Sequence, residues 1–377
     1  MGRPSATLIA PLALLAASLA GACGDPLVVL GDAPGIARVV AGIGDSIGTR
    51  VDSLATRSRF TTPSAVVFGE ATQRLYFADR GSTLTANGVT RHVARLFSVQ
   101  SDGRIARIID RGGCSTGVCL ESAHSMAATP EGDLYISDDV GHRIFRLRPA
   151  SATLEPVAGS GVPGASPDGV AALGAPIHRP SGLAWVDGRL LFAEHGGHRV
   201  RSIEADGTLG TIAGTGDDGS DGDGGAATAA RLSGPVAIAS DGAFLFVAER
   251  EGHRIRQVSL STGTITTLAG DGTAGFRGDG GPATEARFDK PSGLAVTADG
   301  TTLFITDQGN ARVRALDLRA GTIATFAGTG DHAFLPGPRQ AGDISLYLPA
   351  SLSTSPSGFL FIADPGHFVV WRCTLRF

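Results

Sequence analysis

The fold is decided by a stretch that is clearest at residues 179–216, RPSGLAWVDGRLLFAEHGGHRVRSIEADGTLGTIAGTG, and that recurs at residues 290–330. Tight turns at Asp187-Gly188 and Asp206-Gly207 separate short apolar or alternating runs. Four such runs joined by tight turns predict a four-stranded antiparallel meander. One sheet of this kind cannot bury both of its faces alone, so several copies must stack.

The first strand of this unit occurs six times along the chain. The six strands are expected to begin near Pro63, Ala123, Pro180, Pro235, Pro291 and Pro349. An apolar residue stands three positions before each start: Phe60, Leu120, Ile177, Leu232, Phe288 and Leu346. This regular spacing predicts a short helical or turn element in the connection between successive sheets.

The two ends of the chain share one copy of the unit. Residues 36–42 match the fourth strand of the later copies, whereas residues 349–373 supply only the first three strands of the last copy. We therefore expect an N-terminal strand to complete the last sheet. This arrangement closes a ring without a covalent bond and removes the sheet edges that promote aggregation.

Three segments carry a resemblance to a known repeat. Gly-His-Arg-Ile-Arg (252–256), Gly-Asn-Ala-Arg-Val-Arg (309–314) and Gly-Asp-Gly-Gly-Pro-Ala-Thr (278–284) are similar to NHL repeats. The similarity covers residues 35–377 and implies an all-β, six-bladed β-propeller of four-stranded antiparallel blades. Because this fold hosts binding modules, receptors and enzymes, the resemblance alone does not define a function.

The N-terminus has the features of an export signal. Arg3 precedes an apolar run at residues 8–19, which is too short for a transmembrane helix, and small residues follow it. We expect a signal peptide at 1–22, a tether at 23–34 and the propeller at 35–377. The residues before Cys23 resemble a bacterial lipobox, although Ala20 replaces the preferred leucine. Lipidation of Cys23 would anchor the protein in the cell envelope; ordinary cleavage after Ala22 would make it periplasmic or secreted.

The four cysteines suit an oxidising compartment. Cys114 and Cys119 enclose four residues and are expected to form a disulfide. Cys373 lies in the last predicted strand. It is either a buried thiol or, if Cys23 carries no lipid, the partner of Cys23 in a second disulfide.

Every second strand is expected to end in an acidic residue: Asp79, Asp138, Glu194, Glu249, Asp307 and Asp364. In blades two to five an arginine follows five residues later. We therefore predict structural ion pairs across four hairpins: Asp138–Arg143, Glu194–Arg199, Glu249–Arg254 and Asp307–Arg312. The histidines at 142, 198 and 253 share one repeat position, which favours a packing or hydrogen-bonding role at the loop.

In propellers, the start of each first strand and the loop between strands two and three face one mouth of the central channel. The six first-strand positions here are Ser64, His124, Ser181, Val236, Ser292 and Ala350. Among them only His124 binds metals firmly, so a central metal site is disfavoured. The candidates for ligand contact are His124, His178, Arg179 and His195; the alternative is that they are solvated loop residues.

The loop at residues 217–225 has four carboxylates among glycines, a composition that can surround Ca²⁺. It lacks the spaced glutamate of an EF-hand, and the corresponding loop at 271–281 is less acidic. We interpret it as an ordinary connection between blades and predict no cofactor, with calcium as the alternative. The chain contains no recognisable motif for a catalytic nucleophile.

The function indicated is binding. The formal net charge of -4 offers no basic surface for nucleic acid. We expect an exported cell-envelope binding or scaffold protein whose partner is a protein, peptide or glycan and which meets the membrane only through a lipid anchor. The insertion at residues 80–94 in the first blade and the disulfide loop are the expected specificity elements. The alternative is a metal-dependent lyase or lactonase-type enzyme at the channel mouth.

Overall fold

A computed structural model of the protein describes residues 36–42, 54–86, 89–110, 118–335 and 337–375. The predicted signal peptide, the tether, Cys23 and Cys114 lie outside these residues. Lipidation of Cys23 and the disulfide between Cys114 and Cys119 therefore stay predictions. None of the helices in the described part of the chain is long and apolar enough to cross a membrane.

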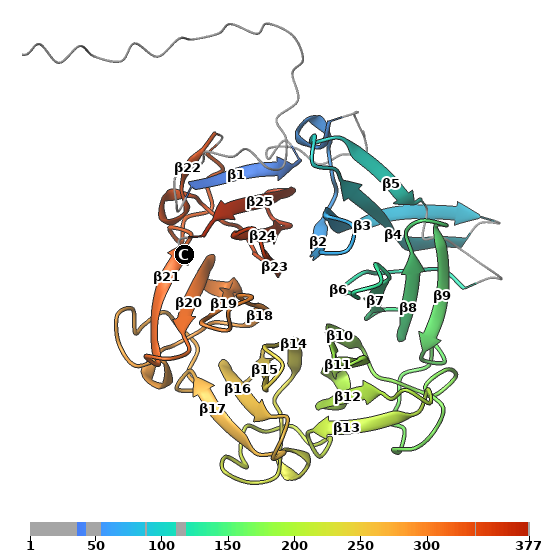
Figure 1. The fold of residues 1–377 in the computed structure, drawn as a ribbon, viewed down its shortest axis with the longest axis vertical. Coiled ribbons are helices and arrows are strands. Elements are labelled where there is room, and N and C mark those ends of the chain that lie inside the picture. Colours follow the sequence, from blue (N-terminus) through green and yellow to red (C-terminus); the bar gives the residue numbers. More distant parts are fainter. Residues whose placement is uncertain (1–35, 43–53, 87–88, 111–117, 336, 376–377) are drawn as a thin grey trace, which may run out of the picture.

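Six antiparallel sheets surround a central axis, each sheet forming one blade (Figure 1). Blade one contains β2 (Pro63–Gly69), β3 (Arg74–Ala86), β4 (Val89–Val99) and β5 (Ile105–Ile109). Blade two contains β6 (Ser125–Ala128), β7 (Leu134–Asp138), β8 (Arg143–Arg148) and β9 (Thr153–Ala158). Blade three contains β10 (Pro180–Val186), β11 (Arg189–Glu194), β12 (Arg199–Ile203) and β13 (Leu209–Ala213).

The other three blades repeat this order. Blade four contains β14 (Pro235–Ser240), β15 (Phe244–Glu249), β16 (Arg254–Ser259) and β17 (Ile265–Ala269). Blade five contains β18 (Pro291–Val296), β19 (Thr302–Asp307), β20 (Arg312–Asp317) and β21 (Thr322–Ala327). Blade six contains β23 (Ser351–Ser355), β24 (Phe359–Asp364), β25 (Val369–Thr374), β1 (Ile36–Ala41) and β22 (Arg339–Gln340). The predicted six-bladed propeller is confirmed.

The ring closes through the N-terminal strand, as predicted. β1 pairs antiparallel with β25, with Val39 opposite Trp371. The short strand β22 pairs with the other edge of β1, with Ile36 opposite Gln340, and this outer cover was not predicted. Both edges of β1 are therefore paired, which limits edge-to-edge association. Cys373 in β25 is a fully buried free thiol, and burial raises its pKa to about 12.

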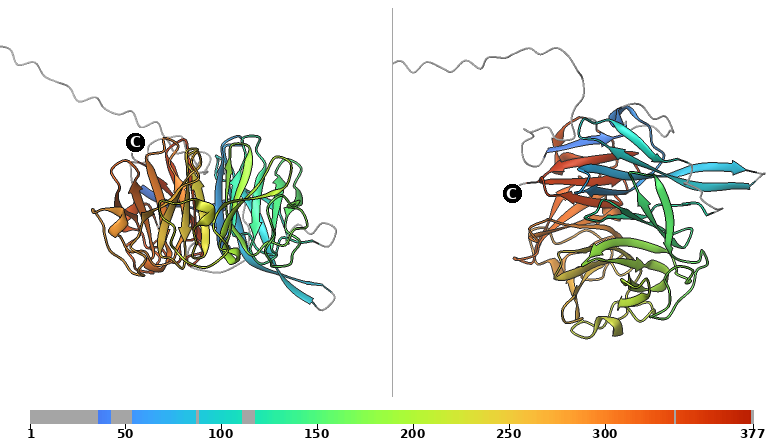
Figure 2. Two further views of the ribbon diagram at one scale, coloured as in Figure 1. Left: turned by 90° about the horizontal axis from the view of Figure 1, so that it is seen from below. Right: turned by 45° about the vertical axis from the view of Figure 1, so that its right-hand side comes forward.

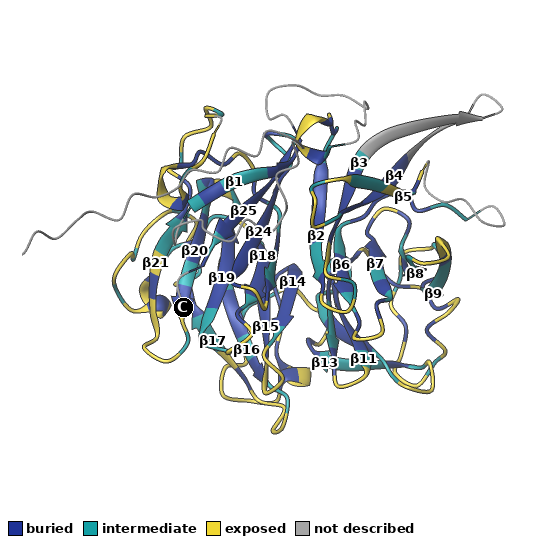
Figure 3. Ribbon diagram, turned by 45° about the horizontal axis from the view of Figure 1, so that its top comes forward, coloured by how far each residue is buried: buried dark blue, intermediate teal, exposed yellow. Residues whose placement is uncertain are grey.

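Short 3-10 helices lie in the connections between blades. They are η1 (Ala55–Arg57), η4 (Ala227–Ala229), η5 (Ala283–Glu285) and η7 (Ala341–Asp343), and each buries its first alanine. The apolar residues that precede the first strands are all fully buried: Phe60, Leu120, Ile177, Leu232, Phe288 and Leu346. The predicted connecting elements are thus present and pack their apolar side chains between blades. Figure 3 shows burial following the strands and exposure concentrated in the loops.

The insertion in blade one extends two strands. Beyond Asp79 the pairing of β3 with β4 continues from Ser82 opposite Val93 to Ala86 opposite Val89. This hairpin projects beyond the rest of the ring (Figure 2). The insertion in blade one is therefore a two-stranded β-ribbon and not an irregular loop.

The acidic residues at the ends of the second strands hold the connections that enter each blade. The Glu194 carboxylate accepts a hydrogen bond from the backbone N–H of His178 at 2.7 Å. Equivalent bonds run from the N–H of Ser233 to Glu249, of Asp289 to Asp307 and of Tyr347 to Asp364. One carboxylate per blade thus satisfies backbone donors that would otherwise be buried without a partner.

The ion pairs of these acids differ from the prediction. Glu194 and Arg199 are opposite each other in the ladder, but the arginine that pairs with Glu194 is Arg201, at 3.5 Å. Arg256 likewise pairs with Glu249 at 3.3 Å, and Arg314 with Asp307 at 3.5 Å. The predicted arginines donate to loop carbonyls: Arg143 to Ser160, Arg199 to Thr215, Arg254 to Ser220 and Arg312 to Thr329.

The reason for this correction is burial. The side chains of Arg201, Arg256 and Arg314 are fully buried, and a buried guanidinium needs a counter-charge. Each receives a second carboxylate from the preceding connection: Asp168, Asp223 and Asp279, at 3.0, 2.6 and 2.6 Å. Arginines such as Arg199 lie nearer the surface, where backbone carbonyls suffice.

Blades two and six lack the buried arginine. Phe145 occupies the equivalent position, seven residues after Asp138. Burial raises the pKa of Asp138 to about 7 against the backbone N–H groups of Gly141 and Glu121, and it raises the pKa of Glu249 to about 7 even beside Arg256. In blade six the position holds Trp371, whose Nε1–H donates to Asp364 at 3.3 Å. The acid is therefore kept in every blade, while its side-chain partner varies.

We expect closure of the ring to depend on β1. A chain that begins at Gly42 lacks β1, which leaves β25 with an unpaired edge and uncovers Trp371. This chain should unfold at a lower temperature and associate in solution. Thermal denaturation and light scattering would measure both effects against a control chain that begins at Gly35. Equal behaviour of the two chains would contradict the role assigned to β1.

The two arginines of one blade should contribute unequally to stability. Arg201→Met leaves the buried Glu194 carboxylate without its cation and should cost about 3–5 kcal/mol of unfolding free energy. Arg199→Met removes a hydrogen bond near the surface and should cost about 1 kcal/mol. Denaturant midpoints of the two variants would test the difference. A larger loss of unfolding free energy for Arg199→Met than for Arg201→Met would support the ion pair between Glu194 and Arg199 that the sequence predicts.

Candidate functional site

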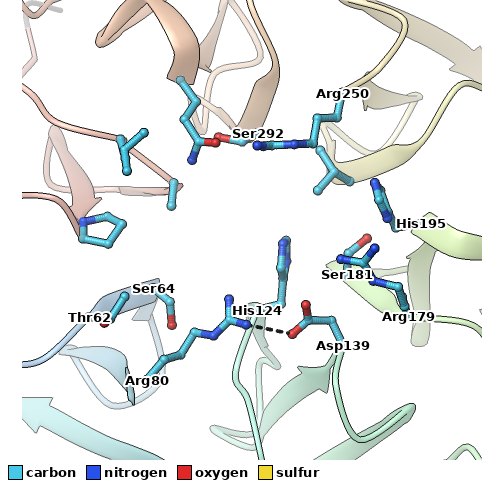
Figure 4. Close-up of a pocket in the computed structure, with 15 residues that line it drawn as sticks. Thr62, Ser64, Arg80, His124, Asp139, Arg179, Ser181, His195, Arg250 and Ser292 are labelled. Carbon is cyan, nitrogen blue, oxygen red and sulfur yellow. Dashed lines mark hydrogen bonds and ion pairs between the residues drawn. The ribbon is translucent and has the colours of Figure 1, made fainter.

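A cavity of about 420 Å³ opens at one end of the central channel, and all six blades contribute to its wall. Figure 4 shows its side chains arranged around one central space. We call this space the mouth cavity. Its inner ring consists of the first-strand positions Ser64, His124, Ser181, Val236, Ser292 and Ala350. This placement agrees with the expectation that these positions face the channel mouth.

A second ring was not recognised from the sequence, apart from His195. It consists of the residue that directly follows each second-strand acid: Arg80, Asp139, His195, Arg250, Gln308 and Pro365. Because the acid is anchored to backbone N–H groups, the next residue is held at the mouth. These residues could have been found from the sequence, because each directly follows the acid of a second strand.

The channel narrows below the mouth cavity. The space enclosed there by the first strands is only about 50 Å³, too small for an organic ligand. Two glycines allow the strands to come this close: a Cβ on Gly182 would lie 2.5 Å from the Cα of Ala237, and one on Gly293 would lie 2.7 Å from the carbonyl oxygen of Ala350. A ligand of the mouth cavity therefore meets a floor.

The inner-ring serines connect neighbouring blades. The hydroxyl of Ser64 donates to the carbonyl of Ala123 at 2.7 Å. Ser181 and Ser292 donate in the same way to Pro235 and Pro349, at 3.3 and 3.2 Å. The hydroxyl protons in blades one, three and five are thus used within the fold.

His124 has a different environment. Its Nδ1 atom is buried and has no hydrogen-bond partner in the described part of the chain. Burial lowers the pKa of His124 to about 4, against the opposing effect of Asp139. The imidazole is therefore neutral at neutral pH and brings an unused polar atom to the inner ring.

The charged residues of the cavity are unevenly paired. Arg80 contacts Asp139 at 3.3 Å, and Asp139 also accepts a hydrogen bond from the hydroxyl of Ser122 at 2.6 Å. Burial raises the pKa of Asp139, but His124 and Arg80 outweigh this effect, so that the pKa lies below its usual value. At the rim, Nε2 of His195 lies 3.3 Å from a carboxylate oxygen of Glu251.

The structure brings together three of the four residues proposed as ligand contacts. His124, Arg179 and His195 line the mouth cavity. His178 lies outside it and packs against His142, with ring centres 5.8 Å apart. A Cβ on Gly196 would lie 2.7 Å from the His178 ring, so this histidine instead shapes the loop that carries His195.

The repeated histidines form hydrogen bonds to the next blade, in agreement with the sequence interpretation. His142, His198 and His253 all have left-handed backbone conformations, with φ of 51°, 52° and 51°. The Nδ1 atom of His142 accepts from the backbone N–H of Arg179 at 3.1 Å, and that of His253 from Lys290 at 3.3 Å. His142 therefore fixes the backbone of a residue that lines the mouth cavity.

The described residues contain no group of three His, Cys, Asp or Glu side chains that could hold a metal ion. In the acidic loop at 217–225, Asp223 pairs with the buried Arg256 and Asp221 with Arg231. Two of the four carboxylates that were considered as calcium ligands therefore serve as partners of arginines.

The closed ring of four-stranded blades around a channel defines the chain as a six-bladed β-propeller. No protein-family model matches it. "NHL repeat-containing protein 2" from Homo sapiens is 26% identical over 304 residues, which cover 71% of this chain and 40% of that protein. The same protein from Bos taurus is 34% identical over 116 residues, which cover 30% and 16%. Their similarity, together with the six-bladed ring, supports an NHL-repeat propeller, and the chain spans less than half the length of these relatives.

Solved structures share the fold at low sequence identity. An auxiliary nutrient binding protein from Bacteroides thetaiotaomicron has a TM-score of 0.62 and 14% identity, over 89% of this chain and 75% of that chain. A structural genomics protein of unknown function from the same organism has a TM-score of 0.66 and 12% identity, over 90% and 75%. A streptogramin B lyase has a TM-score of 0.50 and 14% identity, over 84% and 94%.

We expect acid to weaken the contact between His142 and Arg179. Burial lowers the pKa of His142, helped by the nearby His178 and Arg179, so the unfolded chain binds the proton first as the pH falls. Stability from this contact is therefore present at neutral pH and is lost as the pH falls below the unfolded pKa of about 6.5.

Hydrogen exchange at the backbone amide of Arg179 would measure this effect. After correction for the intrinsic rate, exchange should be faster at pH 5 than at pH 7. His142→Asn is the control, since asparagine tolerates the left-handed backbone but does not titrate. Equal protection of the wild-type amide at both pH values would contradict the proposed role of His142.

Proposed function

We propose that this NHL-repeat propeller is an exported binding protein that holds its ligand in the mouth cavity. One observation carries the proposal: the residue type is repeated in every blade at the structural acid but differs from blade to blade at the next position, which lines the cavity. All six second strands carry an acid at the equivalent position, whereas the next position holds Arg80, Asp139, His195, Arg250, Gln308 or Pro365.

This contrast separates structural positions from functional ones. A closed ring needs equivalent contacts in every blade, so a residue that supports the ring is repeated. The second ring does not repeat one contact: its side chains line the channel mouth, and those that reach the next blade, such as Arg80 to Asp139 and His195 to Glu251, do so with different partners. Concave sites with a few convergent polar groups are the usual place for ligands. The mouth cavity has these properties.

The wider setting of the protein is also part of the proposal. Two Bacteroides proteins with this fold are named auxiliary nutrient binding proteins, which is in keeping with a binding role. Export and a lipid anchor at Cys23 rest on residues 1–23 alone. In this setting the mouth face would meet a protein, peptide or glycan at the cell envelope, and the projecting β3–β4 hairpin would offer a second contact surface.

A lyase or lactonase-type enzyme is the second candidate. The observation in its favour is His124, a neutral imidazole with an unpartnered Nδ1 in the cavity wall. Such a group can remove a proton from a bound substrate. Binding is ranked first because no nucleophile or second acid–base group is paired with His124 in the described residues.

Filling the cavity tests the proposal. Gln308→Trp places a large ring at the mouth, while the control Ala320→Trp places the same ring at an exposed turn between β20 and β21. Thermal-shift screening of saccharides, peptides and small organic acids would identify ligands of the wild type. Titration calorimetry should then show binding at least tenfold weaker in Gln308→Trp and unchanged in Ala320→Trp.

Two outcomes would overturn the binding assignment. If every ligand binds Gln308→Trp as tightly as the wild type, the mouth cavity is not the site. If a ligand is converted to a product, and His124→Ala abolishes the conversion while retaining binding, the enzyme candidate replaces the binding protein. Chromatography of the ligand after incubation measures conversion directly.

A further inference from the structure

The electrostatics of the mouth cavity are opposite in sign to those of the whole chain. The chain carries a formal net charge of -4, yet the cavity wall contains Arg80, Arg179 and Arg250 against a single carboxylate, Asp139. The three arginines come from blade one, the entry to blade three and blade four. Their gathering is therefore a product of the fold and is invisible in local sequence.

Only one of the three arginines is neutralised within the cavity. Arg80 and Asp139 form an ion pair at 3.3 Å. The Arg179 side chain makes no hydrogen bond or ion pair with any described residue. Arg250 lies 3.9 Å from Glu251, whose side chain is 51% exposed and whose other oxygen faces His195. Two guanidinium groups are thus left with weak partners or none.

The environment makes these charges costly without a ligand. Burial lowers the pKa of Arg250, and the nearby Arg179 lowers it further, whereas Glu251 and Asp289 oppose both effects. Two like charges close together in a partly enclosed space destabilise each other. An anion between them would relieve this repulsion, and guanidinium groups bind planar oxyanions through paired hydrogen bonds.

We propose that the mouth cavity binds the oxyanion of a small hydroxylated organic acid, with Arg179 and Arg250 as its principal contacts. This inference rests on the proposed function and names the chemical class of its ligand. The anionic group lies between the two arginines, whose side chains border the same central space (Figure 4). The rest of the ligand extends over the floor of the cavity towards His124.

The cavity also restricts the size and polarity of the ligand. A volume of about 420 Å³ above a narrow channel accommodates one small organic molecule rather than a folded chain. The His124 imidazole lines the cavity wall and is a polar group that a ligand hydroxyl can contact, while its Nδ1 is buried in the protein without a partner among the described residues. The inner-ring serines already donate to neighbouring blades, so His124 is the principal polar contact at the floor.

Calorimetric titration with three matched sugars tests the inference. The probes are D-glucuronate, glucose 6-phosphate and glucose, which share one ring and differ in the group at its end. At 20 mM salt the acidic probes should bind at least tenfold more tightly than glucose. Their relative affinities distinguish a carboxylate from a phosphate ligand, and both should bind more weakly at 300 mM salt because screening reduces charge attraction.

Arginine variants assign the contacts. Arg179→Gln and Arg250→Gln should each weaken binding of the preferred acid at least tenfold, and Arg250→Lys should retain part of the affinity. Arg189→Gln is the matched control. Arg189 begins β11, whereas the cavity residue His195 follows the last residue of β11, and Arg189 pairs with Glu204 outside the cavity. Its affinity should stay within twofold of the wild type. Thermal midpoints would confirm that all variants are folded.

The failures of the two proposals are distinguishable. Equal affinity for glucose and the acidic probes, or acid binding that neither glutamine variant weakens, would overturn the oxyanion site. If neutral ligands are nevertheless lost in Gln308→Trp, the binding function stands with a different ligand class. If no ligand of any class depends on the cavity, both proposals fail.

Discussion

The structure depends on placing a charged arginine inside each of several blades. Arg201, Arg256 and Arg314 are fully buried, and each lies between the acid at the end of a second strand and an aspartate from the preceding connection. A buried guanidinium is tolerated only when its charge and donors are satisfied. These contacts tie two strands and one connection of a blade into a single unit, which explains why Gly-Asp-Gly-Gly segments recur between blades.

The same acids determine where the mouth cavity lies. Each carboxylate binds the backbone of the connection that enters its blade, so the chain passes the channel mouth at the same height six times. The residue after the acid then faces the channel. A rigid structural frame thus presents a ring of variable side chains, a division of labour that suits a scaffold for recognition. The cationic character of the mouth follows from which residues occupy that ring.

The periodic features are predicted correctly from the sequence, whereas the four predicted ion pairs between an acid and the arginine five residues later are wrong. Strand spacing, buried apolar positions and ring closure all repeat, and a repeated pattern is readable without coordinates. The pairing of Glu194 with Arg199 was inferred from their opposition in a hairpin. Arg201, two residues further on, takes that place because it is fully buried and Arg199 is not. The pairing of two strands does not show which of two arginines on the same strand is the more deeply buried.

The sequence by itself determined the six-bladed ring, its four-stranded blades and the use of residues 36–41 to complete the last blade, since these follow from the period of turns and apolar runs. It also identified His124, Arg179 and His195 as neighbours of the channel. Only the tertiary structure decided that Arg179 and Arg250 line the same cavity, that Asp139 neutralises Arg80 and that His178 lies outside the cavity. Contacts across the channel join residues from separate blades, and no spacing along the chain encodes the distance between them.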